Sequence, residues 1–212
     1  MRKTLGVRRM SRLRTLQRLW SLGVVLLGLA LAPASALAAL TIEIVGAGAS
    51  QIPVSIVPFA AESGLPQSIT GVVAADLQRS GLFRLIDGTG IQPQPHEPAE
   101  VQYPVWKERG ADALVIGGIQ RRPDGRIEVR FRLLDVVKQA QLAGYSYVIT
   151  PEQLRAAAHK IADVVYEKLT GDVGVFSTKI AYVLKSGPRY ELQVADADGF
   201  NAQTVLSSRE PI

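Results

Sequence analysis

The sequence predicts an α/β (α+β) protein in which helices cover one face of a β-sheet. Three features predict this fold: three strand-like segments in residues 111–149, a long amphipathic helix after Thr150, and short strands without helices after Phe176. Strands that are apolar on one side need a cover, and the apolar side of an amphipathic helix supplies it. We therefore expect a sheet at the centre of the protein and helices packed on it.

The middle strand of the predicted sheet alternates between apolar and charged residues. Its apolar positions are Ile127, Val129, Phe131 and Leu133. Its charged positions are Arg126, Glu128, Arg130 and Arg132. A period of two is typical of an antiparallel strand with one buried face. We interpret the charged side as a solvated sheet surface. The alternative interpretation is a docking surface for a partner.

Other strands are predicted on either side of this one. Residues 113–119 are almost wholly apolar, which indicates an interior strand covered on both faces. The turn after that strand lies at residues 123–125, where Pro presets φ and Gly accepts a positive φ. Residues 52–59 and 83–86 also have the composition of short strands. These segments would complete the sheet.

Two helices are predicted in the first half of the chain. Ser68 can cap a helix that ends at Ser80-Gly81. Its apolar face carries Ile69, Val72, Val73 and Leu77. After a proline-rich loop at residues 88–98, a short helix should begin near Pro104 and place Trp106 inward.

The strongest helix signal follows the sheet. Thr150 can act as N-cap, Pro151 suits the first helical position, and Gln153 completes a capping box. The residues at helical spacing after it are Leu154, Ala158, Ile161, Val165 and Leu169. Gly171 marks the expected end of the helix. We expect this apolar stripe to lie on the sheet and to form a major part of the core.

The chain changes character after Phe176. Residues 179–184, 190–195 and 204–206 are short strand-like segments joined by turns at 186–188 and 196–199. This pattern predicts a small antiparallel β-meander. A single such unit would leave apolar faces uncovered, so we expect it to be poorly packed by itself.

The first 39 residues have the features of a secretory signal peptide. Seven basic residues and no acid lie in residues 1–20, an apolar run follows at about residues 22–31, and Ala36-Leu37-Ala38 offers a cleavage site. The run is shorter than the roughly 20 residues that a membrane-spanning helix needs. We therefore expect cleavage after Ala38 or Ala39 and no membrane span in the mature chain.

Removal of the signal changes the charge of the protein. The loss of seven of the 24 basic residues leaves 17 against 19 acidic residues, so nucleic-acid binding loses its support. The chain has no cysteine, so no disulfide can stabilise it.

The residues do not form a recognisable catalytic set. His96 and His159 are 63 positions apart and there is no cysteine, so spacing predicts no metal site. We interpret Asp76 as a solvated or helix-local carboxylate. The residues Asp124, Asp196 and Asp198 are interpreted as turn formers. The sequence therefore predicts no catalytic, cofactor-binding or metal-binding residues.

Several long segments occur in an order that resembles the TolB family of the Tol-Pal cell-envelope system. They are IPVSIVPF, ITGVVAADLQRSGLFRLID, ADALVIGGIQRRPDGRIEVRFRLLD, HKIADVVYEKLTGDVGVFSTKIAYV and YELQVADADGFNAQTVL. The resemblance implies a signal peptide at residues 1–39 and an α/β domain at 40–172, with two to three helices on a small mixed sheet. Residues 173–212 would be the first strands of a β-propeller, which we expect to be truncated here.

The resemblance also implies a non-enzymatic role in the periplasm, in outer-membrane integrity and cell division. The C-terminal domain of TolA would bind the mature N-terminal segment. The residues of this segment are Leu40, Thr41, Ile42, Glu43, Ile44, Val45, Gly46 and Gly48. Alternation of Ile42 and Ile44 suits strand addition to a partner's sheet, and an edge strand of its own domain is the plainer alternative. The lipoprotein Pal would bind the propeller, most of which lies outside this sequence.

A periplasmic small-ligand-binding protein or hydrolase on the same domain is the alternative function. It would require a cavity in which polar or ionisable groups converge. A closed cavity lined by two or more buried carboxylates or a histidine would favour it.

Overall fold

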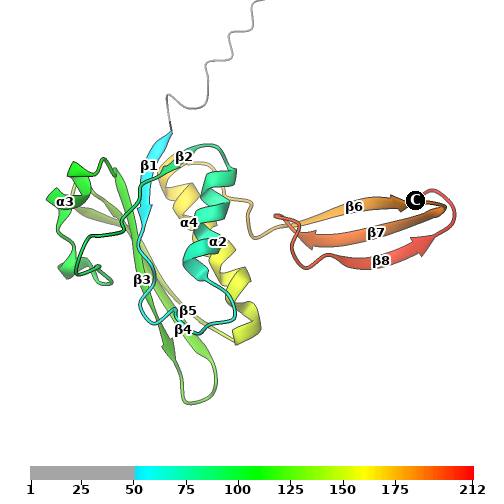
Figure 1. Ribbon diagram of the computed structural model, residues 1–212, viewed down its shortest axis with the longest axis horizontal. Helices are drawn as coiled ribbons and strands as arrows, with labels where there is room; N and C mark the ends of the chain where they lie inside the picture. Colours follow the sequence, from blue (N-terminus) through cyan, green and yellow to red (C-terminus); the bar gives the residue numbers. More distant parts are fainter. Residues whose placement is uncertain (1–50) are drawn as a thin grey trace, which may run out of the picture. The chain divides into compact units, whose positions relative to one another are not determined.

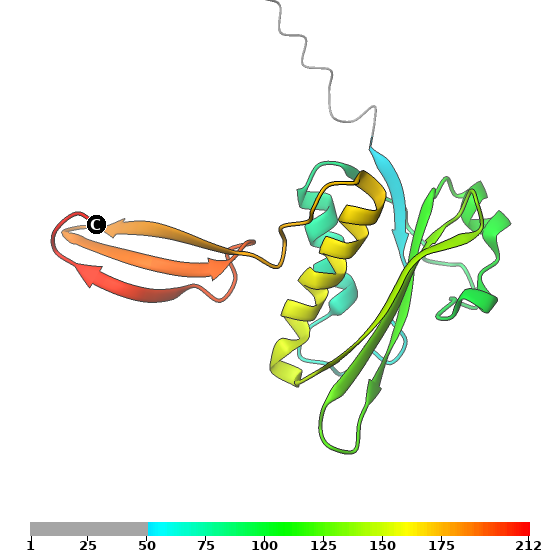
Figure 2. The same ribbon diagram turned by 180° about the vertical axis from the view of Figure 1, so that it is seen from behind.

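A computed structural model describes residues 51–212 of the chain (Figure 1). These residues form a five-stranded sheet, three α-helices and a second, three-stranded sheet. Figures 1 and 2 show helices α2 and α4 side by side on one face of the larger sheet, with α3 on the opposite face. The expected α/β fold is confirmed.

The larger sheet is mixed, with the strand order β2-β1-β3-β4-β5. Its strands are β1 (Ile52–Ile56), β2 (Phe83–Leu85), β3 (Ala113–Arg121), β4 (Ile127–Asp135) and β5 (Ala140–Ile149). Strand β1 is parallel to both β2 and β3, whereas β3, β4 and β5 are antiparallel neighbours. The three strands predicted in residues 111–149 are therefore confirmed, and β5 lies at one end of the sheet.

The capping patterns mark both ends of α2 and the C-terminal end of α4. Helix α2 (Ile69–Arg79) starts after Ser68, whose Oγ accepts the N–H of Gly71 at 2.9 Å. Helix α4 (Leu154–Thr170) is preceded by a capping box and a 3-10 turn, η3 (Pro151–Gln153), so its α-helical part starts later than expected. It ends at Gly171, which has a φ of 87°.

A short helix covers the other face of the sheet. Helix α3 (Tyr103–Glu108) follows a 3-10 turn, η2 (Pro98–Glu100), and places Trp106 in the interior with 1% of its surface exposed. Gly88 lies against this indole, because a Cβ there would come within 2.8 Å of the ring. The indole packs in one cluster with Leu114 and Ile116 of β3.

The core has two parts, one on each face of the sheet. The larger part joins the sheet to α2 and α4 and includes Val129, Phe131 and Val165, each 0% exposed. The smaller part surrounds Trp106 and includes Leu114 from β3. Each large aliphatic side chain that is fully buried stabilises the fold by about 1.5–3 kcal/mol. Strand β3 is covered on both faces, as its apolar sequence predicts.

The second sheet contains β6 (Lys179–Ser186), β7 (Arg189–Asp196) and β8 (Gln203–Ser208), all antiparallel. The predicted meander is confirmed, and its strands are longer than expected because backbone pairing continues through polar residues at their ends. Large apolar side chains remain exposed on it: Ile180, Val183, Leu184, Val205 and Leu206. No helix in residues 51–212 has both the length and the apolar character needed to span a membrane.

Candidate functional site

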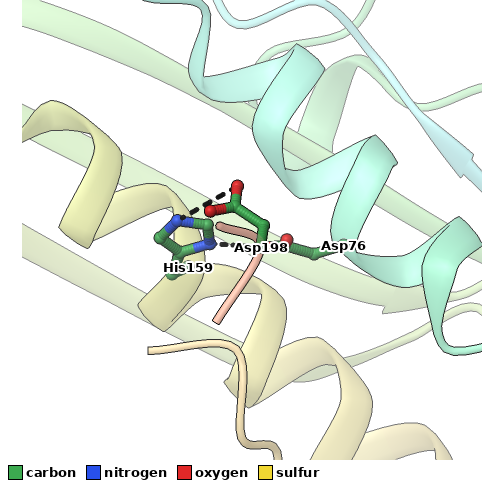
Figure 3. Close-up of side chains that lie close together, drawn as sticks. All are labelled: Asp76, His159 and Asp198. Atoms are coloured by element: carbon green, nitrogen blue, oxygen red, sulfur yellow. Dashed lines mark hydrogen bonds and ion pairs between the residues drawn. The ribbon is translucent and has the colours of Figure 1, made fainter. Parts of the chain in front are cut away.

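A buried polar cluster links α2, α4 and the turn between β7 and β8. His159 of α4 lies between the carboxyl groups of Asp76 and Asp198 (Figure 3). Its Nδ1 is 2.6 Å from Asp76 Oδ2, and its Nε2 is 3.9 Å from Asp198 Oδ2. His159 is 3% exposed and Asp76 is 0% exposed. The Nδ1 atom is within hydrogen-bond distance of Asp76, whereas the buried Nε2 faces Asp198 and has no hydrogen-bond partner within residues 51–212.

Arginines neutralise the two carboxylates of this cluster. Arg79 donates to Asp76 Oδ1 at 3.1 Å from one helical turn away. Arg155 forms an ion pair with Asp198 and also lies over the ring of Phe200, 4.1 Å from its centroid. These contacts attach the turn between β7 and β8 to the two helices.

A second polar contact on α4 holds the segment that leads into the meander. The carboxylate of Asp163, 5% exposed, accepts the backbone N–H of Phe176 at 2.7 Å and that of Ser177 at 3.2 Å. Gly174 passes so close to α4 that a Cβ would come within 2.5 Å of Asp163 Cα. Arg155, His159 and Asp163 are spaced four residues apart, so one side of α4 carries all these contacts.

Asp196 adds a further ion pair at the same turn. Burial raises the pKa of its carboxyl, but the ion pair with Lys179 and the hydrogen bond from Asn201 Nδ2 at 3.1 Å outweigh that effect. The pKa of Asp196 therefore lies below its ordinary value. The turn is held in place by charges as well as by backbone bonds.

The geometry of Asp76, His159 and Asp198 invites comparison with a metal site. One possible ligand atom from each residue lies within 4.8 Å of the others. However, the two ring nitrogens face different carboxylates, and Arg79 and Arg155 already balance both carboxylate charges. A divalent cation would meet two neighbouring positive charges there. We conclude that this group is an ion-pair network, and the absence of a metal site stays a prediction.

The interpretation of Asp76 as a solvated carboxylate is wrong. Its side chain is buried between α2 and α4 and contacts His159, which is 83 positions away in the sequence. Its contact with Arg79 is helix-local, as expected. The turn roles of two other aspartates are confirmed: Arg126 N donates to Asp124, and Phe200 N donates to Asp198. No local pattern could show that Asp198 also reaches α4.

The segment expected to bind TolA lies outside the described residues. It comprises Leu40, Thr41, Ile42, Glu43, Ile44, Val45, Gly46 and Gly48, whereas the description begins at Gln51. These residue assignments therefore stay predictions.

Two cavities formed by residues 51–212 bring no catalytic set together. A cavity of about 250 Å³ at the carboxyl ends of β1 and β2 is lined mainly by apolar groups, with Asp87 as its one carboxylate. A cavity of about 160 Å³ on the face of the sheet opposite α2 and α4 is lined by His96, Glu97 and two arginines of β4. The buried residues Asp76 and His159 line neither of them. The closed cavity with buried carboxylates that a hydrolase would need is not formed by these groups.

Comparison with known proteins shows which family the chain resembles. The model of the TolB amino-terminal domain matches residues 40–142. The Tol-Pal system protein TolB of Nitrosospira multiformis is 62% identical over 176 residues, which cover 82% of this chain and 40% of that protein. The same-named protein of Nitrosomonas europaea is 58% identical over 178 residues, covering 84% of this chain and 41% of that protein.

A solved structure of a TolB protein is also similar to the chain. The crystal structure of TolB from Acinetobacter baumannii is similar with a TM-score of 0.67 and 37% sequence identity, over 76% of this chain and 40% of that one. The chain thus spans about two fifths of the length of the relatives it matches. It contains a TolB amino-terminal domain and belongs to the TolB family.

Proposed function

We propose that the chain is a periplasmic adaptor of the Tol-Pal system, which supports outer-membrane integrity and cell division through protein contacts and not through catalysis. The observation that carries this proposal is the match of residues 40–142 to the TolB amino-terminal domain. Relatives that are 58–62% identical are named Tol-Pal system protein TolB. The ion-pair network of the preceding section supports a scaffold role, because its charged groups pair with one another and hold the turn between β7 and β8 against α4.

Export to the periplasm is part of the proposal. The basic and apolar composition of residues 1–39 supports a cleaved signal peptide. The domain match begins at Leu40, directly after the expected cleavage site. The exported product would then start with the segment that carries the proposed TolA contact.

The C-terminal domain of TolA is the proposed partner of residues 40–48. This segment precedes β1, whose first residue, Ile52, is already paired with Phe83 of β2. Apolar residues at alternate positions, Ile42 and Ile44, suit addition of a strand to the partner's sheet, with main-chain bonds supplying affinity and the two side chains supplying specificity. Pal is proposed to bind the part of the full-length protein that this chain does not include.

An NMR titration of the exported chain with the C-terminal domain of TolA tests the proposal. Perturbed signals should concentrate in residues 40–50. The double substitution Ile42→Ser and Ile44→Ser should weaken binding by roughly tenfold or more, since each buried aliphatic side chain contributes over 1 kcal/mol. The matched control changes the alternate face, Thr41→Ser and Glu43→Ser, and should have a smaller effect. Equal effects of the two pairs would rule out strand addition.

A further inference from the structure

The face of the larger sheet opposite α2 and α4 carries the charged side chains of β4. Near the hairpin that joins β3 to β4, these charges are paired with one another. Arg126 Nη2 is 2.7 Å from Asp124 Oδ2. Glu128 Oε2 is 3.4 Å from Arg122 Nη1, and Glu128 Oε1 is 3.7 Å from Arg130 Nε. This end of the row therefore fits the interpretation of a self-satisfied, solvated surface.

Arg132, at the other end of the row, is different. It is half-buried, and within residues 51–212 its guanidinium forms no ion pair; Nη1 donates only to the carbonyl oxygen of Phe131, at 2.8 Å. Its aliphatic stem lies across Gly144 of β5, where a Cβ would come within 2.6 Å of Arg132 Cδ. A partly desolvated guanidinium without an anion is unfavourable, so the arrangement calls for an explanation.

Arg132 lines the cavity of about 160 Å³ described above, together with Arg130, His96 and Glu97. His96 contributes a second unsatisfied group, because its Nδ1 is buried and has no hydrogen-bond partner in the part of the chain that the structure describes. Gly118 of β3 also lines the cavity, and a side chain at this position would approach Ala60 within 3.3 Å. The cavity thus brings together two arginines and an imidazole, with one carboxylate among its lining residues.

We propose that this cavity binds a carboxylate group of a partner protein, supplied by an Asp or Glu side chain or by a C-terminus. A guanidinium matches a carboxylate with two parallel hydrogen bonds, and the imidazole of His96 is a further polar group in the lining. Pockets that hold whole small molecules measure roughly 300–1,000 Å³, so a cavity of this size holds one side chain. Glu97 favours a singly charged carboxylate over a doubly charged phosphate, since like charges repel.

Side-chain NMR of the arginine Nε–Hε groups in the exported chain provides the test. Acetate should shift the Arg132 signal saturably, whereas acetamide, its neutral isostere, should not. Phosphate at equal concentration should bind less tightly than acetate. Equal shifts with acetamide, or tighter binding of phosphate, would overturn the assignment of a carboxylate site.

Substitutions locate the site. Arg132→Gln keeps most of the stem over Gly144 and should weaken acetate binding roughly tenfold or more, the effect of losing a hydrogen bond to a charged group. Arg130→Gln serves as a second variant if the first proves unstable, and should also weaken binding. Arg126→Gln, which removes the same charge at the hairpin, should leave binding unchanged. Equal losses in Arg126→Gln and Arg132→Gln would show a general charge effect and refute the site.

Capped peptides distinguish the two sources of the carboxylate. One arm compares a central Glu with Gln, and the other compares a free C-terminus with its amide. The arm in which the carboxylate form binds more tightly identifies the source, and no preference in either arm contradicts the proposal. Removal of residues 40–48 should not change acetate binding. The outcome is therefore independent of the proposed TolA contact.

Discussion

The contact between Asp76 and His159 should contribute much more to stability than an exposed ion pair of the same length. The side chain of Asp76 is 1% exposed and its other ion-pair partner, Arg79, is 45% exposed. His159→Ala leaves this buried carboxylate without its shortest contact, and we expect a loss of about 3 kcal/mol in the free energy of unfolding. A hydrogen bond to a charged group contributes about 1.5–3 kcal/mol, which is the coupling energy expected between the two residues.

A double-mutant cycle with Asp76→Ala and His159→Ala measures that coupling. The assay is urea unfolding followed by the fluorescence of Trp106, which is 1% exposed and reports on the α/β domain. The pair Asp124 and Arg126 is the matched control, since its atoms are 2.7 Å apart but its side chains are 43% and 53% exposed. We expect a much smaller coupling there because water screens it. A buried coupling no larger than that of the control would refute the reasoning.

Three further predictions concern the core, a helix cap and pH. Val165→Asp should cost several kcal/mol, enough to unfold the domain, because it places an unpaired carboxylate at a position that is 0% exposed; circular dichroism shows whether α4 persists. Ser68→Ala should cost about 1 kcal/mol by removing the acceptor of Gly71 N–H, measured as a shift of the urea midpoint. The pKa of Asp196 is lower in the folded protein than its ordinary value of 3.8, so its contribution to stability is present above that value and is lost as pH falls through the folded pKa. Asp196→Asn should therefore lose less stability on acidification than the unchanged protein, and equal losses would contradict this assignment.

Local sequence patterns predict the helices and strands because each of these elements is determined largely by residues close together in the sequence. Ser68 and Gly171 mark helix ends through bonds and φ values set within a few residues. The alternation in β4 identified the buried positions, because the period of a strand is fixed by its backbone. Strand alternation predicts Phe131 in the core and helical spacing predicts Val165 there, and both are 0% exposed.

The polar cluster could not be predicted in the same way. Asp76 and His159 meet because α2 and α4 pack side by side on the sheet, an arrangement that no spacing in the sequence reveals. The four-residue spacing of Arg155, His159 and Asp163 next to the apolar stripe of α4 was a visible signal. It indicates a polar side on a buried helix, but its partners come from α2, from residues 176–177 and from the turn at residues 196–201, which the sequence alone does not place next to α4.

The same limit applies to Arg132. Its position on the charged side of β4 followed from alternation, but its difference from Arg126 depends on which neighbours surround each side chain. Arg126 has Asp124 beside it in the hairpin, whereas Arg132 faces a cavity whose lining includes His96 from a distant loop.

Calorimetry of the exported chain with the C-terminal domain of TolA tests the central claim most directly, in parallel with a variant that lacks residues 40–48. The account predicts saturable binding that the deletion abolishes, with the unfolding midpoint of the α/β domain unchanged. Binding that survives the deletion, or no binding by the intact exported chain, would contradict it.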